Sequence, residues 1–399
     1  MKFLFRALRY RNYRLFFIGQ GISLIGTWMQ QIAMSWLVYR LTNSALLLGI
    51  VGFMGQLPAF LLMPLAGVIA DRYNRHRILV VTQILAMIQA LVLAVLVLAD
   101  IVAIWHIIAL SVILGVVNSF DMPIRQAFTV EMIGKKEDLG NAIALNSSMV
   151  NVARLLGPSI AGIIIAAFGE GPCFLLNAAS YIAAIIALLA MNVTPRAIIP
   201  SDKHILQDLK EGFVYAFNFV PIRAVLILLG AASLLGAPYQ LLMPVFVKDI
   251  FHKGPETLGF LMAAAGAGAL TGAIYLARRK GVAGLHKIIA IASGIFGLGI
   301  IVFALSKVLW FSMAVIFAAG FALMVQMAAS NTVLQTVVEE DKRGRIMSLF
   351  TMAFIGMAPF GSLLAGFLAG KIGAPSTLFF GGVCCIIATL IYSRKMRAA

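Results

Sequence analysis

The stretch GVIADRYNRHR, residues 67–77, places four Asp or Arg side chains between two long apolar runs. The run that follows it, residues 78–99, contains no charged residue, and neither does the later run 288–306. A helix needs about 20 apolar residues to cross the roughly 30 Å hydrocarbon core of a bilayer. Each apolar run therefore predicts a membrane-spanning helix, and residues 67–77 predict the polar connection between two of them.

The composition of the whole chain agrees with this interpretation. The 399 residues are 62% hydrophobic and 12% charged, whereas a soluble globular protein is about half apolar and about a quarter charged. In lipid, backbone N–H and C=O groups must find partners within the protein, so lipid-facing spans are expected to be helical. The sequence thus predicts an all-α membrane protein.

The apolar runs predict twelve spans, at residues 13–38, 44–70, 77–99, 101–121, 139–168, 172–192, 221–247, 256–277, 285–305, 308–331, 345–370 and 375–393. With these spans, 25 of the 31 Lys and Arg residues lie on one side of the membrane and five on the other, and Arg154 lies inside a span. The positive-inside rule then places both termini in the cytoplasm. The net charge of +16 is spread over short loops, so it does not indicate nucleic-acid binding.

The second half of the chain repeats the first at an offset of 204 residues. At this offset Gly157 and Gly169 fall on Gly361 and Gly373, and spans five and six fall on spans eleven and twelve. We therefore predict a six-helix bundle over residues 1–192, a cytoplasmic linker over 193–220 and a second six-helix bundle over 221–399. In the linker, KHILQDLKEGFVYAF has apolar residues at four-residue spacing, which predicts an amphipathic surface helix. It either tethers the two bundles while they move or has no mechanical role.

The opening stretch resembles a known family. Gly67, Asp71, Arg72, Arg75 and Arg77 match, in outline, the Gly-x-x-x-Asp-Arg/Lys-x-x-x-Arg/Lys loop between the second and third helices of the major facilitator superfamily, with Asn74 in place of a usual glycine. GQGISLIGTWMQQIAMSWLVYRLTNSALLLG, residues 19–49, and NVARLLGPSIAG, residues 151–162, resemble the branch that contains enterobactin exporters and macrolide efflux proteins. The resemblance covers the whole chain and implies a transporter in the bacterial cytoplasmic membrane.

This resemblance also implies a role for the loop. In the family, the cluster of loop charges, here joined by Asp121 and Arg125 at the end of span four, latches the cytoplasmic side against span eleven when the transporter faces outward. An acid so close to membrane depth is costly unless it is paired. The alternative is that the arginines only anchor the topology, which leaves Asp71 unexplained.

Arg154 is the only charged residue in the middle of a predicted span. A centred Arg costs about 2.5–3.5 kcal/mol on insertion scales, so its side chain should face protein or a cavity. Pro158 cannot donate to the Arg154 carbonyl, and with Gly157 and Gly162 it forms part of a helix-five element that resembles the one in antiporters. Arg154 either recognises an anionic or acceptor-rich substrate or bonds locally to loosened carbonyls, Asn146, Asn151 or Gln31.

Further polar residues gather in spans one, four, seven and ten, which the family uses to line a substrate cavity. The candidates for cavity residues are Trp28, Gln31, Asn118, Arg154, Tyr239, Gln240, Gln326 and Asn331. Neutral amides and aromatic rings suit a large organic molecule of mixed polarity. Each residue alone is equally consistent with a hydrogen bond between helices.

We therefore expect a secondary transporter that exports a small siderophore-like or drug-like molecule by alternating access. The family implies proton antiport, but no Asp, Glu or His falls in the middle of a span, so facilitated export and antiport through an edge acid both stay open. A lysophospholipid flippase of the same fold is the alternative. The sequence lacks the phosphate-binding and His-Glu-x-x-His motifs of enzymes, and we expect a monomer in the lipid bilayer with no cofactor and no metal.

The predicted topology is testable by cysteine labelling. In a cysteine-free background, Lys203→Cys should react with a membrane-impermeant maleimide only after the cells are opened, because residue 203 lies in the cytoplasmic linker. Lys307→Cys, on the predicted outer side, is the matched control and should react in intact cells. Reaction of Lys203→Cys in intact cells would contradict the topology.

Overall fold

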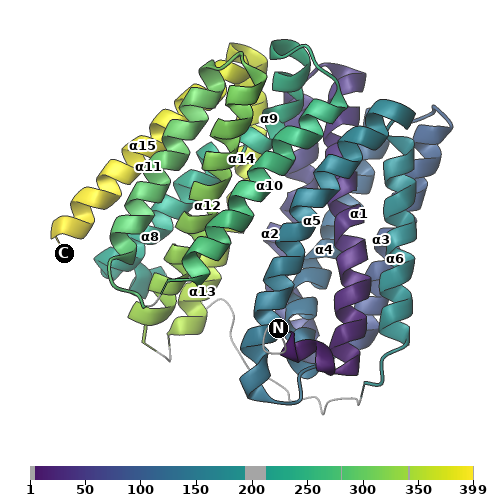
Figure 1. Cartoon of the computed structure of the whole chain (residues 1–399), viewed down its shortest axis with the longest axis horizontal. Coiled ribbons are helices and arrows are strands. Elements are labelled where there is room, and N and C mark those ends of the chain that lie inside the picture. The colour runs from purple at the N-terminus through teal and green to yellow at the C-terminus, as the bar shows by residue number, and fades with distance from the viewer. Residues whose placement is uncertain (1–4, 194–212, 280, 340–341, 399) are drawn as a thin grey trace. The chain divides into compact units, whose positions relative to one another are not determined.

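The computed structural model describes residues 5–193, 213–279, 281–339 and 342–398, without the side chains of residues 63, 64, 66–68, 70–72, 136 and 397–398. Every regular element in these ranges is a helix (Figure 1). The chain forms two compact units: unit 1 comprises residues 1–41 and 54–202, and unit 2 comprises residues 42–53 and 203–399.

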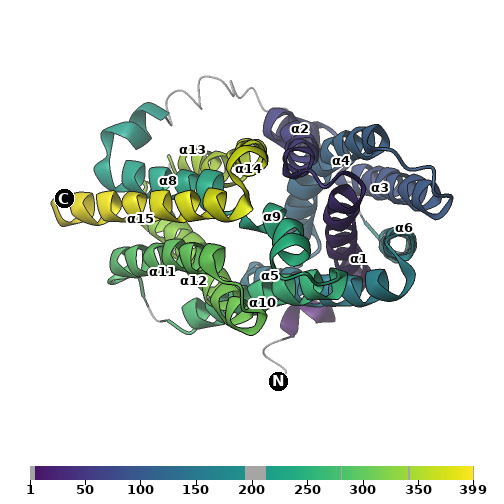
Figure 2. The same cartoon turned by 90° about the horizontal axis from the view of Figure 1, so that it is seen from above.

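The first half of the described chain contains six long helices and two short 3-10 turns. In order they are η1 (Arg6–Arg9), α1 (Arg11–Thr42), α2 (Ala45–Arg72), α3 (Arg75–Leu98), α4 (Ile104–Glu131), η2 (Lys136–Asp138), α5 (Leu139–Phe168) and α6 (Gly171–Leu189). Within unit 1, α1 lies against α3, α5 and α6 (Figure 2). Helix α1 is thus the element around which unit 1 is built.

The second half contains helices of the same kind, with three π-helical turns in two of its spans. In order the elements are α8 (Val220–Ala231), η3 (Ala232–Gly236), α9 (Tyr239–Val245), η4 (Phe246–Ile250), α10 (Pro255–Ala277), α11 (Leu285–Leu305), α12 (Leu309–Val337), α13 (Arg343–Thr351), η5 (Met352–Gly356), α14 (Ala358–Ile372) and α15 (Ala374–Ala398). The predicted spans 221–247 and 345–370 are therefore interrupted rather than straight.

The π turns η3 and η5 come just before prolines and contact each other. Pro238 and Pro359 lack the N–H group that an uninterrupted α-helix needs, and in η3 the Ala237 N–H reaches back five residues to the Ala232 carbonyl. The Ser233 hydroxyl donates to the carbonyl of Phe354, in η5, at 2.5 Å. A side-chain hydrogen bond thus joins the two irregular turns.

Eleven helices in the described residues are long and apolar enough to cross a membrane. Helix α1 is not among them, although it is 32 residues long, because polar residues interrupt its apolar sequence. Trp105 and Trp310, 63% and 78% exposed, stand at the starts of α4 and α12, where aromatic side chains commonly mark the membrane–water interface. An all-helical membrane protein is therefore confirmed.

The division into units differs from the predicted bundles in one segment. Residues 42–53, which include the first turns of α2, belong to unit 2. There a Cβ atom on Gly49 would lie 2.7 Å from the Ser362 carbonyl oxygen and 2.9 Å from the Gly366 Cα, so glycines allow the two backbones to touch. Of the predicted linker helix, residues 213–218 are helical, and residues 194–212 lie outside the described residues.

The glycines that indicated an internal repeat have matching roles in the structure. Gly169 and Gly373 end α5 and α14 with φ angles of +79° and +83°, a conformation that glycine adopts without a steric penalty. Gly157 packs on the backbone of α1, and Gly361 packs on the carbonyls of η3. The 204-residue offset therefore relates positions with the same packing in each unit.

Helix α1 is anchored at both of its ends. Arg40 donates through Nε to Glu170 Oε1 at 2.7 Å and through Nη2 to Oε2 at 3.2 Å. Before the other end, the Tyr10 hydroxyl donates to Asp138 Oδ2 at 2.8 Å, and Arg9 forms an ion pair with the same carboxylate. The hydrogen bond from Tyr10 and the nearby positive charge lower the pKa of Asp138. The C-terminal end of α1 is thus bonded to the residue before α6, and the segment before its N-terminal end is bonded to the 3-10 turn before α5.

Close packing of α10 on α12 depends on two glycines and predicts a stability effect. A Cβ on Gly268 would lie 2.0 Å from the Phe317 carbonyl oxygen, and one on Gly320 would lie 2.2 Å from that of Ala265. Gly268→Ala should therefore lower the free energy of unfolding by about 1–3 kcal/mol, measured by thermal unfolding in detergent. Gly344→Ala is the matched control, because nothing lies within 4 Å of its Cβ position. Equal unfolding temperatures for the two variants would contradict this account.

Candidate functional site

The connection between α2 and α3 is short and ordered by a capping residue. Three predicted latch residues, whose side chains lie outside the described ones, are in the last turns of α2: Gly67, Asp71 and Arg72. Helix α3 begins at Arg75, and the Asn74 side chain accepts a hydrogen bond from the Arg77 backbone N–H at 3.1 Å. Asn74, which replaces a usual glycine of the family, thus serves as the N-cap of α3.

Arg75 pairs with an acid that the sequence analysis did not select. Its Nη1 donates to Glu131 Oε1, at the end of α4, at 2.8 Å. The two side chains are 16% and 21% exposed. Arg77, two residues further along, is exposed to solvent. The arginines of one motif therefore have different surroundings, which the sequence pattern alone did not indicate.

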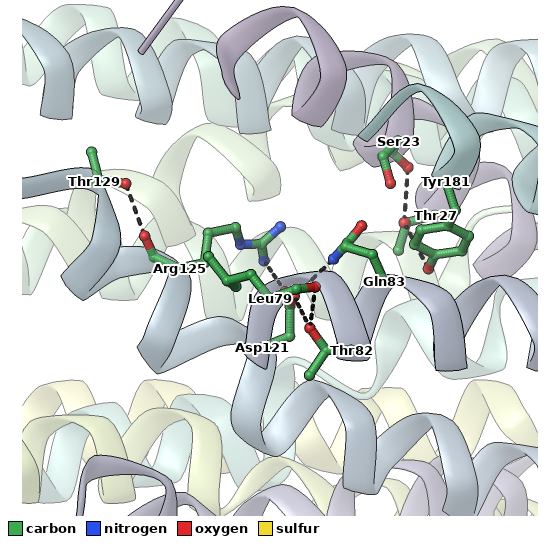
Figure 3. Close-up of polar contacts among 9 residues, drawn as sticks. All are labelled: Ser23, Thr27, Leu79, Thr82, Gln83, Asp121, Arg125, Thr129 and Tyr181. Carbon is green, nitrogen blue, oxygen red and sulfur yellow. Dashed lines mark hydrogen bonds and ion pairs between the residues drawn. The ribbon is translucent and has the colours of Figure 1, made fainter. Parts of the chain in front are cut away.

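Asp121 is a buried carboxylate that accepts hydrogen bonds from two side chains and forms an ion pair with a third (Figure 3). It is 4% exposed. Its Oδ1 accepts from Gln83 Nε2 at 2.7 Å and from the Thr82 hydroxyl at 3.0 Å, both on α3. Its Oδ2 lies 3.4 Å from Nη2 of Arg125, one turn later on α4. The polar pair at residues 82 and 83, inside an otherwise apolar run, was the sequence signal for these missed partners.

Two ion pairs are seen among the described side chains of this region. The side chains of Asp71 and Arg72 lie outside the described residues, so the single cluster stays a prediction. Asp121 and Glu131 are ten residues apart on α4, which places them about 15 Å apart along the helix axis. Asp121 pairs with Arg125 inside the bundle, and Arg75 pairs with Glu131 at the end of α4. The Arg75–Glu131 pair joins α3 to α4. The Asp121–Arg125 pair lies within α4, and Asp121 is joined to α3 through Thr82 and Gln83.

Arg154, the mid-span charge, lies over an aromatic ring. Its guanidinium carbon is 5.5 Å from the centroid of the Trp28 ring on α1, within the range of a cation–π interaction. A Cβ on Gly157 would lie 2.5 Å from Trp28 Cβ and 3.0 Å from the Ile25 carbonyl oxygen. Glycine at 157 therefore lets α5 approach α1 closely enough for Arg154 to reach the ring, beside buried Pro158 and Gly162.

The local partners suggested for Arg154 do not bind it. Asn151 donates to the Ser147 carbonyl of its own helix at 2.9 Å, and Gln31 is exposed. Among the described residues, the Arg154 guanidinium has no hydrogen-bond acceptor and no carboxylate partner. Its described contact is therefore the Trp28 ring.

The other predicted cavity residues have mixed surroundings. Asn118 is exposed in unit 1. In unit 2, Tyr239 and Gln240 begin α9 directly after the π turn η3, and Gln240 donates to the Tyr239 hydroxyl at 3.2 Å. Asn331 accepts from Gln335 at 2.5 Å. Gln326 is fully buried, and its amide nitrogen and oxygen have no partner among the described residues.

The described residues contain no group of three His, Cys, Asp or Glu side chains placed to bind a metal ion. They offer instead a buried carboxylate with its base, an arginine with available donors and neutral amides. Such groups can bind a ligand through hydrogen bonds and charge.

Comparison with known proteins identifies the family. The model of the family described as transmembrane secretion effector matches residues 4–398. The chain belongs to this family of major facilitator transporters. It is a multi-pass membrane transporter with bacterial relatives, and not an enzyme. Its apolar helices suit the bacterial cytoplasmic membrane.

Relatives and solved structures agree with this family over nearly the whole chain. A staphyloferrin A transporter of Staphylococcus aureus is 26% identical and covers 96% of this chain and 97% of its own. A macrolide efflux protein of Streptococcus pyogenes is 22% identical, with 96% of each covered. An enterobactin exporter of Shigella boydii is 25% identical, with 92% and 86% covered.

The fold itself is shared with solved transporters. A bacterial homologue of the human lysosomal transporter Spinster superposes with a TM-score of 0.74, at 16% identity and 97% coverage of both chains. A bacterial homologue of the iron transporter ferroportin gives 0.71 at 17% identity, with 96% and 98% covered. At these identities the likeness establishes the major facilitator fold and nothing further about substrates.

A double-mutant cycle can show whether Arg75 interacts specifically with Glu131 or acts only as a positive charge that sets the topology. We expect a double-mutant cycle with Arg75→Gln and Glu131→Gln to give a coupling energy of about 0.2–1 kcal/mol in thermal unfolding, as partly exposed pairs do. A cycle with Arg77→Gln and Glu131→Gln is the matched control, since it removes the same charge from the same connection, and it should give a value near zero. Equal coupling in both cycles would mean that only net charge matters.

Proposed function

We propose that the protein exports a small siderophore-like or drug-like organic molecule across the cytoplasmic membrane by alternating access. The observation that carries this proposal is Arg154, whose donors have no partner among the described residues and whose face rests on Trp28. A guanidinium with free donors binds carboxylate, phenolate or other acceptor-rich groups strongly. The named cargoes of the relatives, staphyloferrin A, enterobactin and macrolides, support the same class of substrate.

The proposal includes twelve spans with both termini in the cytoplasm. Helix α1 supplies the twelfth span in addition to the eleven apolar ones. Its polar residues lie largely inside unit 1, where other helices can satisfy them, so its lower hydropathy is compatible with crossing the membrane. Each six-helix repeat then forms one bundle, joined through the linker, and the unit acts as a monomer.

We assign the conformational latch to the charged groups around α3 and α4. Arg75 with Glu131, and Asp121 with Thr82 and Gln83, hold these helices together, and Arg125 pairs with Asp121 along α4. Asp71 and Arg72 at the end of α2 belong to the same connection. A change that weakens such contacts alters the populations of the two transport states more than it alters folding. Proton coupling is part of this proposal, with Asp121 as the edge acid that binds the proton.

A groove between α1 and α5 favours a second candidate, a lysophospholipid flippase. Its volume is about 590 Å³ and its lining is almost entirely apolar, with Phe17, Ile25 and Met149 among the lining side chains. Ile18 and Ile22 on its wall are 57% and 47% exposed. An apolar groove of this kind suits a single acyl chain, with a polar head group left for basic or amide side chains.

A binding experiment with Arg154 variants tests the proposed function. A ligand stabilises the state that it binds, by about 2.7 kcal/mol at 100 times its Kd, so enterobactin or erythromycin should raise the unfolding temperature of the wild type. Arg154→Gln should abolish this increase, and Arg154→Lys should retain part of it because it keeps the charge but loses the planar fork.

Lys371→Gln provides the matched control. Lys371 Nζ lies 4.6 Å from the centroid of the Phe367 ring. The substitution therefore removes a comparable cation–π contact that lies in a different unit, far in sequence from the α1–α5 contact. Protection of Arg154→Gln equal to that of the wild type would remove Arg154 from the binding site. Protection by lysophosphatidylglycerol, with none by enterobactin or erythromycin, would favour the flippase.

A further inference from the structure

The last two turns of α10 border a hollow that neither the latch nor the Arg154 site includes. Its volume is about 510 Å³. The side chains that line it follow one face of the helix at three- and four-residue spacing: Thr271, Ile274, Tyr275, Arg278 and Arg279. The lining thus changes from apolar and hydroxyl side chains within the span to two arginines just beyond its end.

The helical part of the hollow has the character of a membrane boundary. Helix α10 is long and apolar enough to cross a membrane, and Ile274 and Tyr275 in its last turn are 44% and 45% exposed. The centroid of the Tyr275 ring lies 5.8 Å from that of Phe321 on α12. Tyrosine is enriched where a span meets the head-group layer, so this exposed wall suits an acyl chain.

The two arginines of the hollow have donors that the protein does not use. The Arg279 guanidinium donates to the carbonyl of Ala283, in a connection that turns back at Gly281 and Gly284, whose φ angles are +84° and +74°. A guanidinium has several N–H donors, so this bond orients Arg279 and occupies only part of its capacity. Among the described residues, Arg278 donates no side-chain hydrogen bond, and neither arginine pairs with a carboxylate.

The first repeat supplies acids at this connection and the second does not. At the offset of 204 residues, Asp71 falls on Tyr275 and Glu131 falls on Gln335. In unit 1, Glu131 is the partner of Arg75. The second repeat therefore keeps the basic residues of the connection without the carboxylates, and its arginines are left for an anion from outside the chain.

Two simpler explanations account for the positive charge alone. Arginines at a helix C-terminus complement the negative end of the helix dipole, and basic connections fix the topology. Neither explanation requires a hollow or an exposed apolar wall beside the arginines. A phospholipid matches all three features, because guanidinium groups bind phosphate oxygens through paired hydrogen bonds and basic pockets at the cytoplasmic ends of spans bind anionic head groups.

We propose that this hollow binds an anionic phospholipid of the cytoplasmic leaflet, with Arg278 and Arg279 on its phosphate and Ile274 and Tyr275 against an acyl chain. The inference goes beyond the proposed function, because the lipid is a bound partner of unit 2 and not the transported molecule. Only the choice of leaflet rests on the proposed topology. Inorganic phosphate would leave the apolar wall uncovered, and a zwitterionic lipid would bring a cationic group toward two positive charges.

Native mass spectrometry of the intact protein, released from detergent, tests this proposal without a transport substrate. In titrations, the first dioleoylphosphatidylglycerol should bind the wild type more tightly than the first dioleoylphosphatidylcholine does. Arg278→Gln should weaken phosphatidylglycerol binding about fivefold, and Arg278→Gln with Arg279→Gln about 25-fold, because each basic side chain near an anionic surface adds a similar free energy. Arg278→Lys with Arg279→Lys keeps both charges and should retain more of the affinity than the double Gln variant.

Arg394→Gln is the matched control, because Arg394 is also exposed, near the end of α15, and does not line the hollow. It should bind phosphatidylglycerol with wild-type affinity, and unfolding temperatures without lipid establish that each variant is folded. Equal affinities for the wild type and the double Gln variant, or for the two lipids, would overturn the inference. Displacement of the lipid by inorganic phosphate at the same concentration would identify a site for a soluble anion and would overturn it as well. No substrate is present, so these outcomes leave the proposed export untouched.

Discussion

The absence of water from the hydrocarbon core is the constraint on which this structure depends. A polar atom within a span must find a partner inside the protein, since no solvent can supply one. Unit 1 meets this constraint by turning the polar residues of α1 toward α3 and α6, where Gln30 bonds to Gln89 and Asn177.

Charged side chains are subject to the same constraint, and burying one without a partner costs more free energy than burying a neutral polar group. Asp121 is tolerated inside the bundle because three side chains converge on it, and the acids at the helix ends are held by arginines that also reach solvent. Arg154 differs, since an aromatic face is its described contact. Among the described residues, no carboxylate or hydrogen-bond acceptor pairs with its guanidinium, which is why its role is a matter for the proposed function rather than for the packing of unit 1.

The sequence was sufficient for the fold because the signals were long and repetitive. Apolar runs of about 20 residues recur along the chain, and glycines repeat at an offset of 204 positions, so several patterns predict the same helices. Gly169 and Gly373 adopt nearly the same φ angle. The partners of individual charges were not predictable in this way. Glu131 and the pair Thr82–Gln83 are distant in sequence from the residues they bind, and only the packing of α3 on α4 brings them together. The π turns were also missed, because a proline in a span is equally compatible with a kink.

Those π turns have a geometric consequence for the second unit. A π turn holds one residue more than an α-helical turn, so it rotates everything after it by about 100° relative to an unbroken helix. The orientation of Tyr239 and Gln240 is therefore set by a surplus residue in η3, and that of α14 by another in η5. The hydrogen bond from the Ser233 hydroxyl to the Phe354 carbonyl joins the two π turns that hold these extra residues. Loss of one extra residue would therefore rotate the face that one span presents by about 100°, while the other span kept its orientation.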